Sequence, residues 1–367
     1  MLKLRIVQAA QGDCLILEDG TPPDRTHVLI DGGPGGTYDG FLRGELQKIR
    51  DGGSKLDLVV LSHVDSDHAI GLRDLMAELE QQRADGTEVT VAVNALWHNS
   101  FRRTIGGGTD IEPRLKVLMA NAGAARNFMT STDIAVQGIS EGDQIRRAAT
   151  VLEIPINVGF PNDLISVDDA PQTIALGGLT LKVVGPTKEN LEELRMKWLE
   201  WLDTYEQSIT TDREPSLAAM ADSSIPNLSS IMLLAESGGR TALLTGDGRG
   251  DHLLQGLDRA GLLNSERKLH VDILKLPHHG SDRNATKGFF EAVTADAYVV
   301  SANGMYGNPD LATLAWIVEV AREQGRSIEV FATNATPSTR HLIEDYNPDE
   351  YGYRLIEMQD GADAMTV

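Results

Sequence analysis

The sequence has one cysteine, few aromatic residues and no long apolar run, and each shortage excludes a class of protein. Cys14 is the only cysteine among 367 residues, so an internal disulfide is excluded. No stretch approaches the roughly 18 consecutive apolar residues that indicate a membrane-spanning helix. Residues 1–20 alternate like a strand and lack the apolar stretch and small-residue cleavage site of a signal peptide. The sequence therefore predicts a cytoplasmic protein with no membrane partner.

Basic residues are also in short supply. The chain has 33 Lys and Arg against 54 Asp and Glu, which gives a formal net charge of −21. Such a surface repels polyanions at long range and argues against extended nucleic-acid binding. Phosphodiester chemistry stays open, because bound divalent metals invert the local field. Hydrophobic residues make up 41% of the chain, which is enough for a substantial packed core.

One short segment concentrates residue types that bind metals. The stretch "LSHVDSDHAIGL", residues 61–72, contains His63, Asp65, Asp67 and His68. The apolar run before it predicts a buried strand, and the apolar spacing over 69–83 predicts a helix. A structural core has no use for such a cluster, because unpaired charges are costly to bury. We therefore expect the cluster at the carboxyl end of a strand, where layered α/β folds usually bind ligands.

Three further apolar runs end in side chains of the same kinds. They are followed by Asp31 in "VLIDGG", Asp247 in "LLTGDG", and His278 with His279 in "LKLPHHG". Each run predicts a buried strand whose end presents a carboxylate or an imidazole. Imidazole and carboxylate together suit zinc, manganese or iron, whereas an all-oxygen set would suit magnesium or calcium. The sequence thus indicates a metal site assembled from separate strands.

Two β-rich regions flank a less regular middle. Residues 2–32 predict a β-meander, and a β-hairpin is expected after residue 228. Between them, 97–226 is interpreted as a partly helical insertion with a mobile loop at 207–226. This pattern predicts one domain over residues 1–367, of the α/β class, with two mixed β-sheets packed face to face and helices outside.

The stretch "HVDSDHAIG" resembles the signature of metallo-β-lactamase-fold hydrolases, in the form HxDxDHxxG instead of the commoner HxHxDHxxG. The stretches "QGDCLIL", "VLIDGG", "SSIMLLAESGGRTALLTGD" and "LKLPHHGS" look like successive blocks of one subgroup. That subgroup is the hydrolase domain of the ComEC competence-channel proteins, with its soluble stand-alone relatives. The resemblance covers roughly 1–95 and 225–310, and it implies the four-layer αββα fold and metal-dependent hydrolysis.

The resemblance also implies a site with two divalent metal ions per chain, zinc or manganese. The first would be held by His63 and Asp65, and the second by Asp67, His68 and one histidine of the pair, with His278 favoured over His279. Asp247 would bridge both ions. Asp67 would orient a hydroxide between them, Asp31 would fix the direction of a ligand, and His279 would be a ligand or a donor to a developing oxyanion. The other residues expected to contact the metal ligands or the substrate are Asn227, Ser230, Arg283 and Asn308.

Departures from the family pattern bear on the metal and on the reaction. The family has a histidine where Asp65 stands and another ahead of the bridging aspartate, where this chain reads "IPNLSSIM". Fewer imidazoles and more oxygens shift the preference from zinc toward manganese. The channel-linked domains tend to show "YGHP" where this chain has "YGNP", so Asn308 replaces a residue able to shuttle a proton.

The sequence favours a phosphodiesterase or nuclease type of hydrolase, with attack by a hydroxide that bridges two metals. Its substrate would be a nucleic acid, a nucleotide or a smaller phosphodiester. One alternative is hydrolysis of a lactone or thioester, which the low aromatic content and the missing histidines make less attractive. A second alternative is a weakly active or inactive fold that binds a protein partner or another copy of itself, through the acidic surface and residues 97–226.

Overall fold

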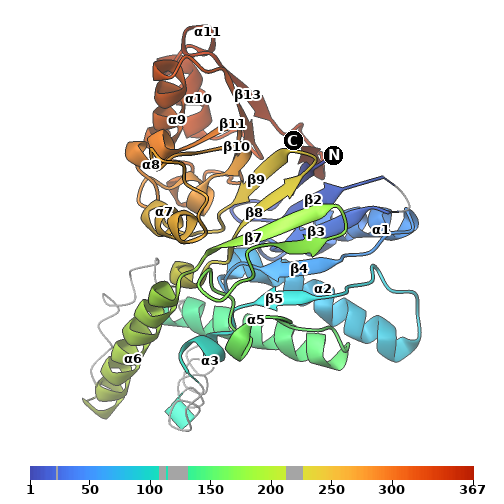
Figure 1. The fold of residues 1–367 in the computed structure, drawn as a ribbon. Coiled ribbons are helices and arrows are strands. Elements are labelled where there is room, and N and C mark those ends of the chain that lie inside the picture. The colour runs from blue at the N-terminus through green and yellow to red at the C-terminus, as the bar shows by residue number, and fades with distance from the viewer. Residues whose placement is uncertain (22–23, 107–112, 115–130, 212–225) are drawn as a thin grey trace.

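The computed structural model describes residues 1–21, 24–106, 113–114, 131–211 and 226–367, and in it the chain folds around two β-sheets (Figure 1). Within these residues the first sheet has the strand order β14–β1–β2–β3–β4–β5. Its strands are β1 (Lys3–Val7), β2 (Leu15–Asp19), β3 (Thr26–Ile30), β4 (Leu58–Leu61), β5 (Leu96–His98) and β14 (Ala364–Thr366). The pairs β14–β1, β1–β2 and β2–β3 are antiparallel, whereas β3–β4 and β4–β5 are parallel. The first sheet is therefore mixed.

The second sheet is also mixed and has the order β13–β12–β11–β10–β9–β8–β7–β6. Its strands are β6 (Ile174–Leu176), β7 (Leu179–Gly185), β8 (Met232–Ser237), β9 (Arg240–Leu244), β10 (Leu269–Lys275), β11 (Val293–Val300), β12 (Ile328–Ala332) and β13 (Tyr353–Glu357). Strands β6 to β9 pair antiparallel, and β9 to β13 pair parallel. Strands β8 and β9 form the hairpin that the sequence predicts after residue 228.

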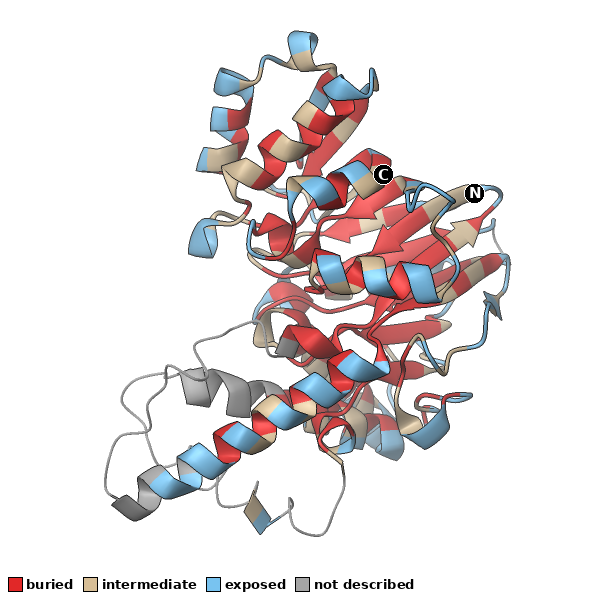
Figure 2. Cartoon of the chain, turned by 60° about the vertical axis from the view of Figure 1, so that its left-hand side comes forward, coloured by how far each residue is buried: buried red, intermediate tan, exposed pale blue. Residues whose placement is uncertain are grey.

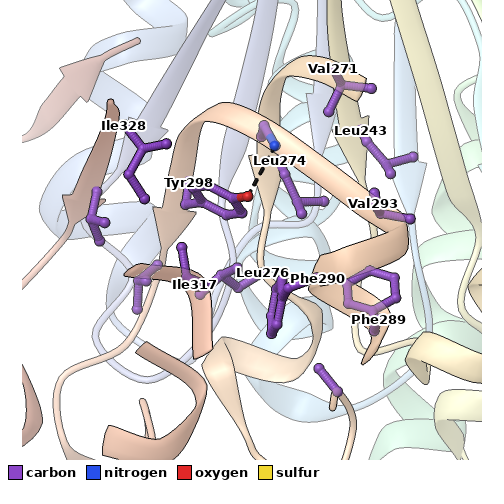
Figure 3. Packing of buried hydrophobic residues seen from close by; sticks show 14 of the residues in the cluster. Leu243, Val271, Leu274, Leu276, Phe289, Phe290, Val293, Tyr298, Ile317 and Ile328 are labelled. Carbon is purple, nitrogen blue, oxygen red and sulfur yellow. Dashed lines mark hydrogen bonds between the residues drawn. The ribbon is translucent and has the colours of Figure 1, made fainter. Parts of the chain in front are cut away.

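Most of the α-helices lie on the outer faces of the two sheets. Those described are α1 (Arg43–Asp51), α2 (Ser66–Asp85), α3 (Phe101–Thr104), α5 (Ser131–Val151), α6 (Lys188–Thr211), α7 (Gly250–Arg259), α8 (Lys287–Ala292), α9 (Leu311–Glu323), α10 (Pro337–Asp345) and α11 (Pro348–Tyr351). Apolar residues of α1, α2 and α5 share one buried cluster with the first sheet. Those of α7 to α10 share another with the second sheet, part of which is drawn in Figure 3. None of the described helices combines the length and the apolar composition needed to cross a membrane.

Alternation along the strands separates three apolar layers. In β2, Leu15 and Leu17 join the cluster between the two sheets, while Ile16 joins the cluster under α1 and α2. In β9, Leu244 faces the layer between the sheets and Leu243 faces the outer layer. Successive side chains of a strand point to opposite faces, so a strand that is apolar at every position is buried on both. The predicted fold class, two mixed sheets face to face with helices outside, is confirmed.

The segment 97–226, interpreted from sequence as an insertion, contributes to the main fold as well. It contains α3, α5 and α6, but also β6 and β7, which form the edge of the second sheet. Helix α6 reaches away from the sheets, with exposed and buried residues interspersed along it (Figure 2). Of the loop expected at 207–226, residues 207–211 belong to α6, Pro226 begins the short helix η4 (Pro226–Ser229), and 212–225 lie outside the described residues.

Candidate metal centre

Four strand ends and one helix start meet at a single place between the sheets. Asp31 follows β3, His63 follows β4, Asp247 follows β9, and the pair His278 and His279 follows β10. The remaining members of the motif come from the start of α2. Asp65 is its N-cap residue, and Asp67 and His68 lie in its first turn. The side chain of Asp65 does not cap the helix, so its carboxylate is available to the site.

The carboxylate of Asp247 lies at the centre of four imidazoles. The Nε2 atoms of His63, His278 and His279 lie 3.7, 3.6 and 3.5 Å from Asp247 Oδ2. His68 Nε2 lies 3.2 Å from Asp247 Oδ1. Two ligand atoms of one tetrahedral ion, each bonded at about 2.1 Å, lie roughly 3.4 Å apart. The four nitrogens therefore have the spacing from Asp247 that ligands of a shared ion require.

Two more carboxylates border this cluster. Asp65 Oδ2 lies 3.6 Å from His63 Nε2, and Asp67 Oδ2 lies 3.5 Å from His279 Nε2. The Nε2 atoms of His68 and His279 are 3.4 Å apart. Among the described residues, the group His63, His68 and Asp247 and the group Asp67, His68 and His279 are each close enough to hold a metal ion.

Asp31 controls the orientation of both histidines of the first sheet. His68 Nδ1 donates to Asp31 Oδ2 at 2.8 Å, and the Ser62 hydroxyl donates to the same oxygen at 2.6 Å. Because the Ser62 proton is directed at Asp31, Ser62 Oγ accepts from His63 Nδ1, which lies 3.0 Å away. In the neutral form both rings would carry their proton on Nδ1, so that Nε2, which faces Asp247, is the atom left to bind a metal. The structure thus places Asp31 behind His68, the residue that the sequence expects to be a metal ligand.

The two histidines of the second sheet are held in the same way. His279 Nδ1 lies 2.9 Å from the carbonyl oxygen of Ser301, and His278 Nδ1 lies 2.8 Å from Asn284 Oδ1. The amide nitrogen of Asn227 is 3.2 Å from the same His278 nitrogen. The shorter contact assigns the His278 proton to the bond with Asn284. In the neutral form of each ring Nε2 is then the atom without a proton, and it faces Asp247.

Electrostatics favours charged groups throughout the cluster. Burial raises the pKa of Asp247, but His279, His68 and His278 outweigh it and hold this pKa well below its ordinary value. Burial lowers the pKa of His68, yet Asp247, Asp31 and Asp67 raise it well above its ordinary value. The pKa of His279 is raised in the same manner, against its burial, by Asp247 and Asp13. A metal ion that binds Nε2 of either ring has to displace the second proton that these raised pKa values favour.

The residues present fit divalent metal ions. His63 Nε2 and Asp247 Oδ1 are buried and make no hydrogen bond of normal geometry within the described part of the chain. Buried polar atoms of native proteins are nearly always paired, so these two call for a further partner. Imidazole nitrogens mixed with carboxylate oxygens form a donor set suited to zinc or manganese.

The backbone around the centre is strained and closely packed. Asp31, His278 and His279 have φ values of 59°, 45° and 56°, a region that residues other than glycine seldom adopt and that is common at functional sites. A Cβ on Gly71, the last residue of "HVDSDHAIG", would lie 1.9 Å from the carbonyl oxygen of Gly32. Only glycine lets α2, which carries Asp67 and His68, approach the end of β3 this closely.

Two buried charged residues of the centre were not predicted. Lys275 is fully buried, and its ammonium forms an ion pair with the carboxylate of Asp13. From sequence, Asp13 is most simply interpreted as a turn residue. The available signal was Lys275 itself, because a lysine that directly follows the buried apolar residues of a strand requires a buried partner. Asn284 and Ser301, which hold the two histidines, carry no sequence signal of that role.

The residues expected around the ligands lie at different depths. Asn227 and Ser230 are buried, and Ser230 Oγ has no hydrogen-bond partner among the described residues. Arg283 is exposed. Asn308 is half-buried in the loop after β11, and this loop contacts the histidine turn through a hydrogen bond of 3.0 Å from Asp310 N to Gly280 O. Contacts of Arg283 and Asn308 with a substrate stay predictions.

A small cavity lies beside Asp65. It is lined mainly by apolar side chains, among them Val64, Phe101 and Trp198, and its volume is ≈ 10 Å³. A cavity of this size admits about one water molecule. It is a packing gap between the sheet and the helices of the middle segment, too small for a substrate group.

One comparison with known proteins, a scan against family models, matches the first part of the chain. Residues 8–119 match the family model of the Metallo-beta-lactamase superfamily, and this range includes Asp31 and the motif at 61–72. No curated protein matches the chain. A similar solved structure is the metallo-beta-lactamase fold protein YhfI from Bacillus subtilis, with 11% identity and a TM-score of 0.41 over 100% of both chains, too low a score to support an inference. Neither comparison distinguishes the ComEC-related subgroup, so that part of the resemblance stays a prediction.

Proposed function

We propose that the chain is a hydrolase that depends on two divalent metal ions, zinc or manganese, which Asp247 and the residues around it would hold. The observation that carries this proposal is the convergence of four imidazole Nε2 atoms on one buried carboxylate, each within 3.7 Å of it. A structural core gains nothing from such an arrangement, because charged groups are costly to bury and one carboxylate cannot pair with four imidazoles at once.

The ligands divide into two sets. The first ion would be held by His63, Asp65, His278 and Asp247, and the second by Asp67, His68, His279 and Asp247. The sequence favoured His278 for the second ion. The geometry supports His279 there, because its Nε2 lies 3.5 Å from Asp67 Oδ2 and 3.4 Å from His68 Nε2.

His278 is then free to complete the first set. Its Nε2 lies 3.6 Å from Asp247, and it contacts Asn227, which belongs to the segment where the family has a histidine. We infer that His278 supplies the imidazole that this segment lacks. Four imidazoles instead of three make the donor set as suitable for zinc as for manganese.

The cluster is accessible from one side. His63, His68 and Asp247 are buried, whereas the side chains of Asp65 and Asp67 are each 28% exposed. Two bound divalent cations would lower the pKa of a water and stabilise the charge that develops on the substrate. Asp67 would accept a hydrogen bond from the attacking water and orient it, and substrate would approach over Asp65 and Asp67.

A phosphodiester is the substrate class we propose. The extra negative charge of the transition state on phosphorus needs compensation, which two cations provide and the acidic chain otherwise lacks. Arg283, four residues after His279, is exposed and would supply a cationic contact for a phosphate oxygen. The net charge of −21 favours a small phosphodiester or a nucleotide over a long polyanion.

A substrate panel tests this function. Wild type, Asp247→Asn and the exposed-site control Asp360→Asn are loaded with Mn²⁺ or Zn²⁺ and assayed with bis(p-nitrophenyl) phosphate, a thioester and a lactone. We expect turnover of the phosphodiester, a loss of at least about 100-fold in Asp247→Asn, and no change in Asp360→Asn. Preference for the thioester or lactone would refute the substrate class. Two bound cations without turnover would favour the partner-binding alternative, and no bound cation would refute the proposal altogether.

A further inference from the structure

Building on this proposed function, we propose that Lys275 is a positioning residue of the metal centre, holding Asp247 in place from behind. Lys275 is the last residue of β10, and its side chain is 0% exposed. Its Nζ contacts the carboxylate of Asp13, donates to the carbonyl oxygen of Gly246 at 3.2 Å, and lies 3.9 Å from Asp247 Oδ1. The ammonium therefore touches the residue before Asp247 and faces the carboxylate itself.

Asp13 connects this ammonium to the other half of the centre. It lies in the turn between β1 and β2, 1% exposed, and its backbone N–H donates to the carbonyl oxygen of Asp67 at 3.3 Å. Its Oδ1 lies 3.5 Å from His279 Nδ1. The same turn is tied to the second sheet by a bond of 2.6 Å from the Ser301 hydroxyl to Gly12 O.

The ligands come from both sheets, so the distance between the sheets decides whether the centre forms. The first sheet and α2 supply His63, Asp65, Asp67 and His68, and the second sheet supplies Asp247, His278 and His279. The ion pair of Lys275 with Asp13 crosses from one sheet to the other directly behind these ligands. We infer that it sets the relative position of the two ligand groups.

The charge balance explains why this position holds a cation and not a neutral donor. Five carboxylates belong to the centre and its immediate support: Asp13, Asp31, Asp65, Asp67 and Asp247. Two divalent cations would offset four of these charges, and Lys275 offsets the fifth. An uncompensated buried charge would be strongly destabilising.

Lys275 also decides which clusters can bind metal. Asp13, Asp247 and His279 lie close enough together to hold an ion. The Lys275 ammonium already contacts Asp13 and faces Asp247 within this group, so it occupies the place that a third cation would need. We therefore expect each chain to bind two cations and no third.

Paired substitutions separate positioning from simple neutralisation of Asp13. The full-length chain is prepared as Lys275→Met, as Lys275→Met with Asp13→Asn, and as the exposed-lysine control Lys3→Met. The thermal midpoint of each metal-depleted protein is measured, and the protein is then titrated with Mn²⁺ alone. For the Mn²⁺-loaded proteins, kcat and KM are measured with bis(p-nitrophenyl) phosphate.

We expect Lys275→Met to lower the thermal midpoint, because Asp13 is left buried and unpaired. The double variant should recover most of the lost thermal midpoint, since no unpaired charge remains. It should still bind Mn²⁺ 10- to 100-fold more weakly than wild type, the usual effect of losing a group that supports metal ligands, and show a lower kcat at unchanged KM. Lys3→Met should resemble wild type.

If the double variant binds Mn²⁺ and turns over substrate like wild type, Lys275 only neutralises Asp13, and the positioning role is refuted. Three cations bound to wild type would refute the exclusion of a third. If wild type binds no Mn²⁺ or Zn²⁺, the proposed function itself fails, which is a different result from wild-type behaviour of the double variant.

Discussion

Replacing Asp31 by asparagine changes no volume but removes the acceptor on which two histidines depend. In the wild type, Asp31 Oδ1 accepts from the Ser62 backbone N–H at 2.7 Å. Oδ2 accepts from the Ser62 hydroxyl at 2.6 Å and from His68 Nδ1 at 2.8 Å. Asparagine has one acceptor oxygen and one donor nitrogen, so it cannot accept all three protons. If the amide oxygen keeps the hydrogen bond from the Ser62 backbone, the amide nitrogen faces the Ser62 hydroxyl and His68 Nδ1. The nitrogen is itself a donor, so it cannot accept their protons.

The expected consequence is a change of tautomer. His68 would accept from the amide at Nδ1 and carry its proton on Nε2, the atom that faces Asp247. His63 would lose its fixed proton position as well, because Ser62 can then direct its hydroxyl at His63. Losing one such partner of a metal-binding histidine typically costs 10- to 100-fold in metal affinity, or about 1.4–2.8 kcal/mol. Since one substitution affects two histidines, we expect the upper end of this range.

The assay is a Mn²⁺ titration of metal-depleted Asp31→Asn beside wild type and Asp360→Asn, with thermal unfolding of each protein to verify that it is folded. We expect wild type and Asp360→Asn to bind Mn²⁺ with equal affinity, and Asp31→Asn to bind it close to 100-fold more weakly. A folded Asp31→Asn that binds two Mn²⁺ within about 2-fold of the wild-type affinity would refute the role of Asp31 and with it the assignment of protons to Nδ1.

Three further predictions concern packing, pH and proton release. Gly71→Ala should lower the free energy of unfolding in urea by about 1–3 kcal/mol through overpacking, whereas Gly44→Ala in α1, where nothing lies within 4 Å of the added Cβ, should be neutral or slightly stabilising. Burial lowers the pKa of His98 to about 3, below its unfolded value of 6.5, so His98 should not affect stability above pH 6.5. As pH falls from 6.5 to 3 it should cost up to about 1.4 kcal/mol per pH unit, a slope that His98→Gln lacks. Because carboxylates raise the pKa values of His68 and His279 against their burial, Mn²⁺ binding at pH 7 should release protons, measured as a buffer-dependent enthalpy in calorimetry.

Each of these has a result that would contradict it. Gly71→Ala as stable as Gly44→Ala would mean that α2 does not need its close approach to β3. Equal pH slopes for wild type and His98→Gln would mean that His98 is protonated in the fold. A binding enthalpy that is the same in buffers of different ionisation enthalpy would mean that neither His68 nor His279 holds a displaceable proton.

The sequence predicted those parts of the site that depend on local pattern. An apolar run followed by a carboxylate or an imidazole indicates a buried strand and its tip, and Asp31, His63, Asp247 and His279 all follow strands as expected. The consecutive apolar residues of β2 and β9 likewise predict strands buried on both faces. For this reason the four-layer arrangement and the membership of the cluster were accessible without a structure.

The parts that depend on tertiary packing were not accessible. His278 and His279 are adjacent and chemically identical, and only the turn Pro277–Gly280, with positive φ at both histidines, decides what each faces. Lys275 and Asp13 meet from different sheets, so no spacing in the chain reveals their ion pair. Strand β6 is short and half exposed, so residues 97–226 did not show that they complete the second sheet.

The most direct test of the two-cation centre is anomalous diffraction at the metal edge from crystals loaded with Mn²⁺ or Zn²⁺. The account predicts two peaks about 3.5–4 Å apart, one on each side of the Asp247 carboxylate. The peak nearer His63 and Asp65 should also contact His278, and the other should contact Asp67, His68 and His279. Absence of any peak beside Asp247 in fully loaded crystals, or peaks only at other places on the chain, would contradict it.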